Sequence, residues 1–187
     1  MATQQNNVLT HAMSGMIGNL VVFRNRGGKL VVAKKPKSPD PGKPLSEKQE
    51  ASRRMFRHCS RYANSITEEQ QAMYAAIARN GQTARNVAFS DAYFPPKVTA
   101  IAAAGYSGLP DELIRIEATD NIRVTGVRVE IRTGAGELVE SGEAADDGYG
   151  ENWTYHTTAT NPDPSGSTVT VIARDMPGNL ATETVTV

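Results

Sequence analysis

The sequence predicts an α+β protein: an N-terminal β-hairpin with two or three helices, followed by an all-β sandwich of about seven strands. Three patterns lead to this prediction. Two β-branched runs flank a glycine pair, helical periodicity with two capping boxes lies between residues 46 and 93, and short alternating runs fill the chain from residue 97 onward. These patterns divide the 187 residues into an N-terminal arm at 1–18, a hairpin and helical domain at 19–94, and a sandwich at 95–187.

The composition excludes several classes of protein. Hydrophobic residues make up 39% and charged residues 21% of the chain, which is typical of folded globular proteins. The single cysteine, Cys59, excludes an intrachain disulfide and a cysteine-based zinc site. No apolar run approaches the roughly 18 residues that a membrane-spanning helix needs, so we expect no membrane insertion.

The first 18 residues are polar and then small, and they predict an arm with no packed structure of its own. The first basic residue is Arg24, so the basic region and apolar stretch of a secretory signal are missing from the start of the sequence. We therefore expect cytoplasmic synthesis without a signal peptide. We expect the protein to belong to a virion, or to an extracellular assembly released without Sec export.

Residues 19–25 and 29–34 are two β-branched runs joined by Arg26-Gly27-Gly28, a pattern typical of a β-hairpin. Successive side chains of a strand point to opposite faces, so both faces of this hairpin carry apolar residues. A two-stranded ribbon cannot bury two faces by itself, and the helices or another subunit must cover it. The sequence therefore predicts an assembly interface formed by Leu20, Val21, Val22, Phe23, Leu30, Val31 and Val32.

Four prolines between residues 36 and 44 predict a stiff, extended linker. After it, Ser46-Glu47-Lys48-Gln49 has the spacing of a capping box and predicts a helix that runs to about Asn64. Arg53, Arg57 and Arg61 form a basic stripe along this helix. The stripe is a candidate binding surface for an anionic partner, although arginines at this spacing are also typical of a solvated helix face.

Two further helices are expected before the sandwich. Thr67-Glu68-Glu69-Gln70 is a second capping box and predicts a helix that stops near Gly81. A shorter helix is expected from Ala84 to Tyr93, where Pro95-Pro96 ends the helical pattern.

From Lys97 onward, short strands alternate apolar and polar residues. Ile114, Ile116 and Ala118 alternate with polar residues, and the same alternation recurs through residues 127–132 and 169–173. Turn signals separate about seven such runs, which is the pattern of an antiparallel sandwich.

The two halves of the chain carry opposite charge. Residues 1–94 hold 14 Lys and Arg against 6 Asp and Glu, whereas residues 95–187 hold 6 against 14. The overall net charge is therefore zero, but an electropositive half precedes an electronegative half along the chain. Such an asymmetry indicates either an anionic partner, such as nucleic acid, or the acidic half of a neighbouring copy.

The C-terminal half resembles the immunoglobulin-like domains of bacterial surface proteins and phage virions. The residues that carry this resemblance are Ala118-Thr119-Asp120-Asn121 and Ala173-Arg174-Asp175-Met176-Pro177-Gly178-Asn179, before a last strand that ends in Val185-Thr186-Val187. The resemblance implies that Asp175 hydrogen-bonds the amides of the final turn. It implies an immunoglobulin-like sandwich without the paired cysteines of antibody domains, and no particular function.

The N-terminal half resembles a group of poorly characterised bacterial and phage-associated proteins. These begin with a Gly-x-x-Gly-Asn-Leu-Val-like hairpin and continue through Gly-Lys and a proline-rich link into a helix with Gln and Arg near its start. The matching stretch here runs from Gly15 to Arg54. The resemblance implies a structural or assembly role rather than a catalytic one.

No pattern in the sequence combines a nucleophile with a base, so we expect no enzymatic activity, no cofactor and no metal. The three histidines, His11, His58 and His156, are far apart and lack metal-ligand spacing. Asp146, Asp147 and Glu151 cluster in a glycine-rich stretch that could bind calcium, but the stretch does not match an EF-hand, and a solvated hairpin loop is the simpler interpretation.

The leading hypothesis is a self-assembling structural protein, either a virion component or the subunit of a tube or filament. It would polymerise through the arm and hairpin, head to tail with copies of itself and together with other particle proteins, and display the sandwich outside. The first alternative is a nucleic-acid-binding module that uses the basic N-terminal half. The second is adhesion to a surface or glycan through the sandwich.

Overall fold

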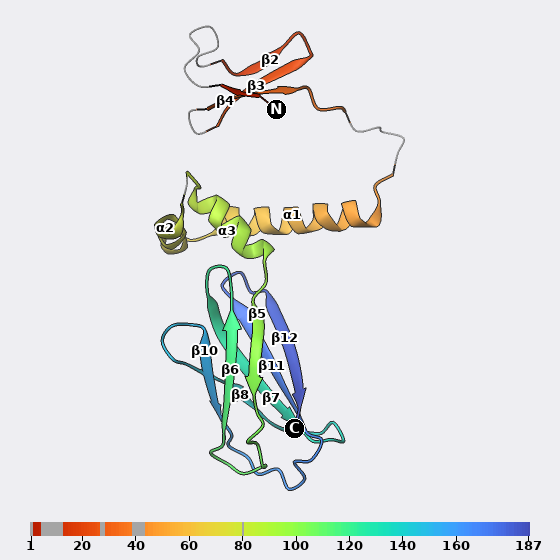
Figure 1. Ribbon diagram of the computed structural model, residues 1–187, viewed down its shortest axis with the longest axis vertical. Helices are drawn as coiled ribbons and strands as arrows, with labels where there is room; N and C mark the ends of the chain where they lie inside the picture. Colours follow the sequence, from red (N-terminus) through yellow and green to blue (C-terminus); the bar gives the residue numbers. More distant parts are fainter. Residues whose placement is uncertain (1, 5–12, 27–28, 39–43, 80) are drawn as a thin grey trace. The chain divides into compact units, whose positions relative to one another are not determined.

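The computed structural model describes residues 2–4, 13–26, 29–38, 44–79 and 81–187. The chain divides into two compact units, an N-terminal unit of residues 1–51 and a C-terminal unit of residues 52–187 (Figure 1). This division differs from the expected one, because the second and third helices and most of the first belong to the unit of the sandwich, and only residues 47–51 of the first helix belong to the unit of the hairpin.

The N-terminal unit contains a four-stranded antiparallel sheet in the order β1-β4-β3-β2, drawn in red and orange in Figure 1. The predicted hairpin is confirmed, since β3 pairs with β4 from Val21↔Lys34 to Arg26↔Lys29. Its glycine turn, at residues 27–28, lies outside the described residues. The strands are β1 (Ala2–Gln4), β2 (Gly15–Ile17), β3 (Val21–Arg26) and β4 (Lys29–Lys34).

The first strand of the hairpin begins later than predicted. Gly18 and Asn19 both have positive φ, at 59° and 58°, and with Leu20 they form the tight turn between β2 and β3. Left-handed backbone ends a strand, so the placement of Leu20 within the strand was wrong. Leu20 lies in the turn with an exposed side chain.

Part of the segment expected to be an arm is paired in the same sheet. Residues 2–4 pair with β4, and residues 15–17 pair with β3. Residues 5–12, which include His11, lie outside the described residues. The sequence showed no strand here because the segment is polar and each strand is only three residues long.

The three helices are confirmed near the predicted boundaries: α1 (Glu47–Ser65), α2 (Glu68–Ile77) and α3 (Ala84–Tyr93). Ser46 Oγ accepts from the Gln49 amide at 3.4 Å, and the Gln49 side chain accepts from the Ser46 amide at 3.0 Å. Thr67 and Gln70 form the second capping box in the same way. The caps satisfy amides that have no partner within the helix, which is why the helices begin where they do.

Among the described residues, no helix is long and apolar enough to cross a membrane.

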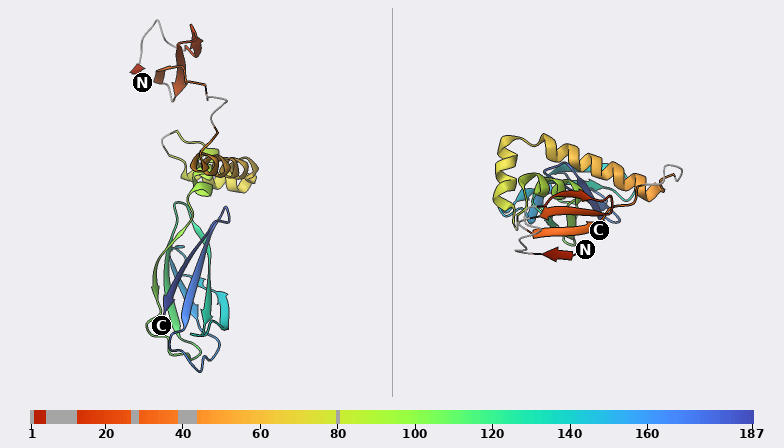
Figure 2. Two further views of the ribbon diagram at one scale, coloured as in Figure 1. Left: turned by 90° about the vertical axis from the view of Figure 1, so that its right-hand side faces the viewer. Right: turned by 90° about the horizontal axis from the view of Figure 1, so that it is seen from above.

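Two four-stranded antiparallel sheets make up the rest of the C-terminal unit, in the orders β5-β6-β10-β9 and β12-β11-β7-β8 (Figures 1 and 2). The inward residues of β6, β7, β10 and β11 form one shared core, which includes Ile116, Val129, Trp153 and Val171. The predicted sandwich is therefore present. The strands are β5 (Lys97–Ala102), β6 (Leu113–Thr119), β7 (Val124–Arg132), β8 (Leu138–Glu143), β9 (Ala145–Asp146), β10 (Asn152–His156), β11 (Thr168–Asp175) and β12 (Leu180–Thr186).

A second, smaller core joins the helices to one end of the sandwich. Tyr74 and Val87 are buried in it, and Ile122 and Met176, from two turns of the sandwich, pack against them. Asn179 adds a polar link, because its side-chain amide donates to the backbone carbonyl of Ala92 at 3.3 Å. These contacts explain why the helices and the sandwich form one compact unit.

Candidate assembly interface

The sheet of the N-terminal unit has apolar side chains on both faces. Directly paired residues of antiparallel strands lie on the same face. One face therefore carries Val21 and Phe23 of β3 with Leu30 and Val32 of β4, and the other carries Val22, Val31 and Ala33. The predicted interface residues, with the exception of Leu20, thus lie on the two central strands of one sheet and are divided between its two faces.

Neither face is fully buried. Leu30 is the only buried apolar residue described in this unit, at 8% exposure, and the valines and Phe23 are half-buried. Met16 and Ile17 of the edge strand β2 are each 54% exposed. All described strands of the unit belong to this single sheet, so the unit offers no second layer to cover either face. Apolar side chains that remain partly exposed on both faces of a sheet indicate that a partner surface would stabilise it further.

The edges of this sheet are short. Strands β1 and β2 form the two edges and contain three residues each. An edge strand leaves a row of backbone amides and carbonyls unpaired, and another strand can pair with them. The sheet therefore offers two ways of association: face packing through apolar side chains and strand addition at an edge.

The basic stripe lies on the predicted helix, α1. Arg53, Arg57 and Arg61 of α1 are all exposed. None of them is in an ion pair with another described residue. Their charges are therefore available to an anionic partner.

An exposed aromatic cluster beside this stripe was missed in the sequence. The rings of Phe56 and Phe89 have centroids 5.1 Å apart, and those of Tyr93 and Phe94 have centroids 5.0 Å apart. Phe89 and Tyr93 link the two pairs at 6.5 Å. Phe56 is 60% exposed. The only signal in the sequence was the i, i+4 spacing of Phe89 and Tyr93, which is equally typical of a buried helix face.

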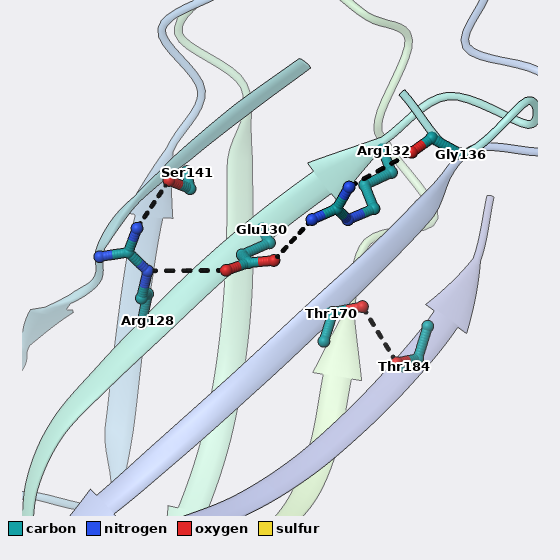
Figure 3. Close-up of polar contacts among 7 residues, drawn as sticks. All are labelled: Arg128, Glu130, Arg132, Gly136, Ser141, Thr170 and Thr184. Carbon is teal, nitrogen blue, oxygen red and sulfur yellow. Dashed lines mark hydrogen bonds and ion pairs between the residues drawn. The ribbon is translucent and has the colours of Figure 1, made fainter. Parts of the chain in front are cut away.

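The outer face of the sheet β12-β11-β7-β8 is polar (Figure 3). Glu130 lies between Arg128, at 3.8 Å, and Arg132, at 3.4 Å, and Thr170 hydrogen-bonds Thr184 at 3.0 Å. Cross-strand polar ladders of this kind are typical of a sheet face that contacts water. This face is therefore the solvent side of the sandwich.

The acidic glycine-rich loop uses its carboxylates to hold its own backbone. Asp146 accepts from the amides of Gly148 and Gly150, and Asp147 accepts from the amide of Tyr149 and the side chain of Asn152. These bonds make the two aspartates part of a tight turn. Among the described residues, no group of three or more His, Cys, Asp or Glu is arranged to hold a metal ion.

The structure describes two of the three histidines, His58 and His156. His58 is exposed on α1, and the imidazole of His156 lies 3.9 Å from the Asp111 carboxylate on the surface of the sandwich.

Asp175 hydrogen-bonds its turn as the resemblance of the sandwich implies. Its Oδ1 accepts from the amide of Gly178 at 2.8 Å and from that of Asn179 at 2.6 Å.

Comparison with known proteins gives no family for this chain. No protein-family model and no curated protein matches it. Among solved structures, CopC from Methylosinus trichosporium OB3b is similar over 49% of this chain and 89% of its own, with 12% identity and a TM-score of 0.37. An engineered protein solved as a structural genomics target is similar over 54% of this chain and 21% of its own, with 24% identity and a TM-score of 0.32. Both likenesses are too weak to indicate a shared fold or function.

Proposed function

We propose that the protein is a non-enzymatic structural subunit that assembles with copies of itself through the N-terminal sheet. The assembled copies would form part of a virion, or a tube or a filament. The sandwich, which we take to be of the immunoglobulin-like type, would be displayed on the outside. The observation that carries this proposal is the apolar character of both faces of a single-layer sheet.

Self-assembly fits this sheet for an energetic reason. Each Å² of apolar surface removed from water contributes about 25 cal/mol, so the half-buried aliphatic and aromatic side chains of each face gain substantially from a partner layer. A copy of the same chain supplies a face of matching shape and polarity without any further component. The opposite charges of the two halves of the chain would orient copies head to tail.

The test compares three single variants of the full-length protein by electron microscopy and light scattering. Val22→Asp places a charge in the middle of one apolar face and should abolish assembly. Val22→Thr keeps the β-branched shape but removes apolar surface, and it should weaken assembly by a smaller amount. Thr182→Asp adds the same charge on an exposed position of β12, in the sandwich, and should assemble as the unmodified chain does.

The fold of the C-terminal unit serves as an internal control in each variant. Trp153, the single tryptophan of the chain, is buried in the sandwich core, and its fluorescence should be the same in all three proteins. Regular particles from the Val22→Asp protein would contradict the proposal. Small single particles from the unmodified chain, over a range of salt concentrations, would also contradict it.

A second candidate function is binding of nucleic acid by α1. The observation that favours it is the stripe of exposed arginines, which form no ion pair with other described residues and lie next to exposed aromatic rings that can stack on bases. The adhesion hypothesis gains no comparable support, since the tryptophan of the sandwich is buried and its outer sheet face is an ordinary polar ladder.

A further inference from the structure

Three aspartates from distant parts of the chain meet where the helices pack on the sandwich. Asp91 lies on α3, Asp120 in the turn between β6 and β7, and Asp175 at the end of β11. Asp91 is 0% exposed and Asp175 is 1% exposed. Burial of a carboxylate is costly unless each of its oxygens finds a donor or its charge is neutralised.

Asp175 satisfies both of its oxygens. Its Oδ1 accepts from the amides of Gly178 and Asn179, and its Oδ2 accepts from the side-chain amide of Asn179 at 2.7 Å. The same Asn179 amide donates to the backbone carbonyls of Asp91 and Ala92, at 3.5 Å and 3.3 Å. Asp175 therefore orients the residue that links the sandwich to α3.

In Asp91 and in Asp120, only one of the two carboxylate oxygens accepts hydrogen bonds. Oδ2 of Asp91 accepts from the hydroxyl of Tyr74 at 2.5 Å, and Oδ2 of Asp120 accepts from the amides of Ile122 and Arg123, at 3.1 Å and 3.0 Å. The remaining oxygen of each, Oδ1, is buried and has no donor among the described residues. The side chains of Asp91 and Asp120 interact with one another, and a hydrogen bond between them favours the protonated form of Asp91.

Two ionised carboxylates cannot hydrogen-bond each other, because both are acceptors. With one proton between them, one carboxyl donates to the other, both buried oxygens gain a partner, and one of the two negative charges disappears. We propose that Asp91 and Asp120 share a proton, and that this carboxyl–carboxylate bond is a pH-sensitive latch between the helices and the sandwich. The proposal does not depend on self-assembly.

The surroundings of the pair favour the protonated form. Burial, together with the negative charges of Asp120 and Asp175, raises the pKa of Asp91 to about 7, although the hydrogen bond from Tyr74 opposes the shift. The titratable groups that face it are Tyr74 of α2, Tyr62 of α1, which hydrogen-bonds Tyr74 at 2.8 Å, and the two other aspartates. The pKa of both tyrosines is raised, mainly by burial, so they remain neutral donors through the range in which Asp91 titrates.

The sign of the pH effect follows from these values. In the unfolded chain Asp91 has an ordinary pKa of about 3.9, so the folded state binds the proton more tightly. Protonation of Asp91 therefore stabilises the folded state. This stabilisation is complete below about pH 4, falls as the pH rises, and is lost above the folded-state pKa of about 7. Mildly alkaline pH should therefore weaken the joint between α3 and the sandwich.

A divalent cation could neutralise the pair instead of a proton. The arrangement of the described residues favours the proton, because Asp175, the third acid at the joint, already accepts hydrogen bonds with both of its oxygens. Among the described residues, no group of three or more His, Cys, Asp or Glu is arranged to hold a metal ion. The response to calcium distinguishes the two explanations, because only a cation site should be stabilised by it.

The experiment measures the thermal unfolding midpoint of the full-length protein from pH 5 to pH 9. The midpoint of the unmodified chain should fall by about 5–10 °C across this range. In Asp91→Asn the amide oxygen still accepts from Tyr74 and the NH₂ donates to Asp120 without a titrating proton, so the midpoint should stay nearly constant and exceed that of the unmodified chain at pH 8.5. Asp163→Asn, at an exposed position of the sandwich, is the matched control and should follow the unmodified chain.

Two further measurements make the test independent of a single variant. Asp120→Asn should flatten the pH dependence in the same way, because its amide donates to Asp91 while its oxygen still accepts from Ile122 and Arg123. Hydrogen exchange at pH 8.5 should be faster in the α3 segment of the unmodified chain than in Asp91→Asn, whereas β7 and β11 should exchange alike in both proteins.

Parallel pH curves for the unmodified chain and both asparagine variants would overturn the proposal. A midpoint at pH 8.5 that rises with millimolar calcium in the unmodified chain, and not in Asp91→Asn, would assign the pair to a cation and overturn the shared proton.

Discussion

At Gly108 the backbone of one loop touches the backbone of another. An added Cβ would overlap the carbonyl oxygen of Asn161, and Gly108 has a φ of 85°, a conformation that side chains disfavour. The contact is specific, because the Asn161 amide donates to the Gly108 carbonyl at 2.8 Å. The glycine is therefore required by a close approach between the β5–β6 and β10–β11 connections.

Gly108→Ala should lower the free energy of unfolding by at least about 2 kcal/mol, since it combines an unfavourable φ with a backbone clash. Gly105→Ala is the matched control in the same connection, where nothing lies within 4 Å of an added Cβ. It should change the stability by less than about 1 kcal/mol. Chemical denaturation, monitored by the fluorescence of Trp153, measures the free energy of unfolding of both variants. Equal stability of the two variants would show that the loops separate easily.

Glu140 is a buried acid whose role the sequence could not show. Glu140 is buried, and its Oε2 accepts from the Tyr155 hydroxyl and from the backbone amide and hydroxyl of Thr158. This glutamate therefore ties the end of β10 to β8. In the sequence it is one of 20 acidic residues, and nothing nearby distinguishes it from the exposed Glu143.

At the scale of single elements, α1 has two different halves. Residues 47–58 are exposed throughout, whereas Cys59 and Ala63 in the second half are buried against the rest of the C-terminal unit. The apolar residues of this helix are therefore only partly buried, because Met55 lies on the exposed half and is 43% exposed. The exposed half carries most of the arginines and Phe56, and it is available to a partner.

If nucleic acid binds this helix, replacing Arg53, Arg57 and Arg61 together by alanine should weaken binding to a double-stranded DNA oligonucleotide. The slope of log affinity against log salt should fall by about 0.9 for each phosphate that the helix no longer neutralises. The triple lysine variant is the control, since it keeps three positive charges on the same face and should keep most of the slope. Fluorescence anisotropy at several salt concentrations measures both. Equal binding by the alanine variant and the unmodified chain would exclude the stripe as the binding surface.

At the scale of the whole molecule, the two units differ in how many of their apolar residues are buried. The C-terminal unit has two apolar cores and buries most of its inward residues, whereas the N-terminal unit buries one described apolar residue. Stability should therefore reside in the C-terminal unit, and association in the N-terminal one.

A fragment of residues 44–187 should fold with a single cooperative transition, because it contains both cores and the first helix cap. It should remain monomeric at concentrations where the full-length chain assembles. Light scattering measures association, and the fluorescence of the buried Trp153 measures folding, so the two properties are tested separately. A fragment that assembles as the full chain does would place the interface in the C-terminal unit, with the aromatic cluster as its first candidate.

Local patterns in the sequence were enough to predict most of the elements. The capping boxes at Ser46 and Thr67 located two helix starts, and the alternation around Ile116 and Val129 located the inward faces of two core strands. These features depend on residues that are neighbours along the chain, so periodicity and cap chemistry are sufficient to find them. The apolar residues of the hairpin were predicted for the same reason.

Only the tertiary structure decided how distant segments combine. It placed the helices with the sandwich, paired residues 2–4 and 15–17 with the hairpin, and gathered Asp91, Asp120 and Asp175 at one joint. These arrangements depend on contacts between residues that lie up to 88 positions apart, as in the bond from Asn179 to Asp91. Such contacts arise from packing and leave no periodic signal, so the sequence by itself determined the elements and their faces, and the folded chain determined which faces meet.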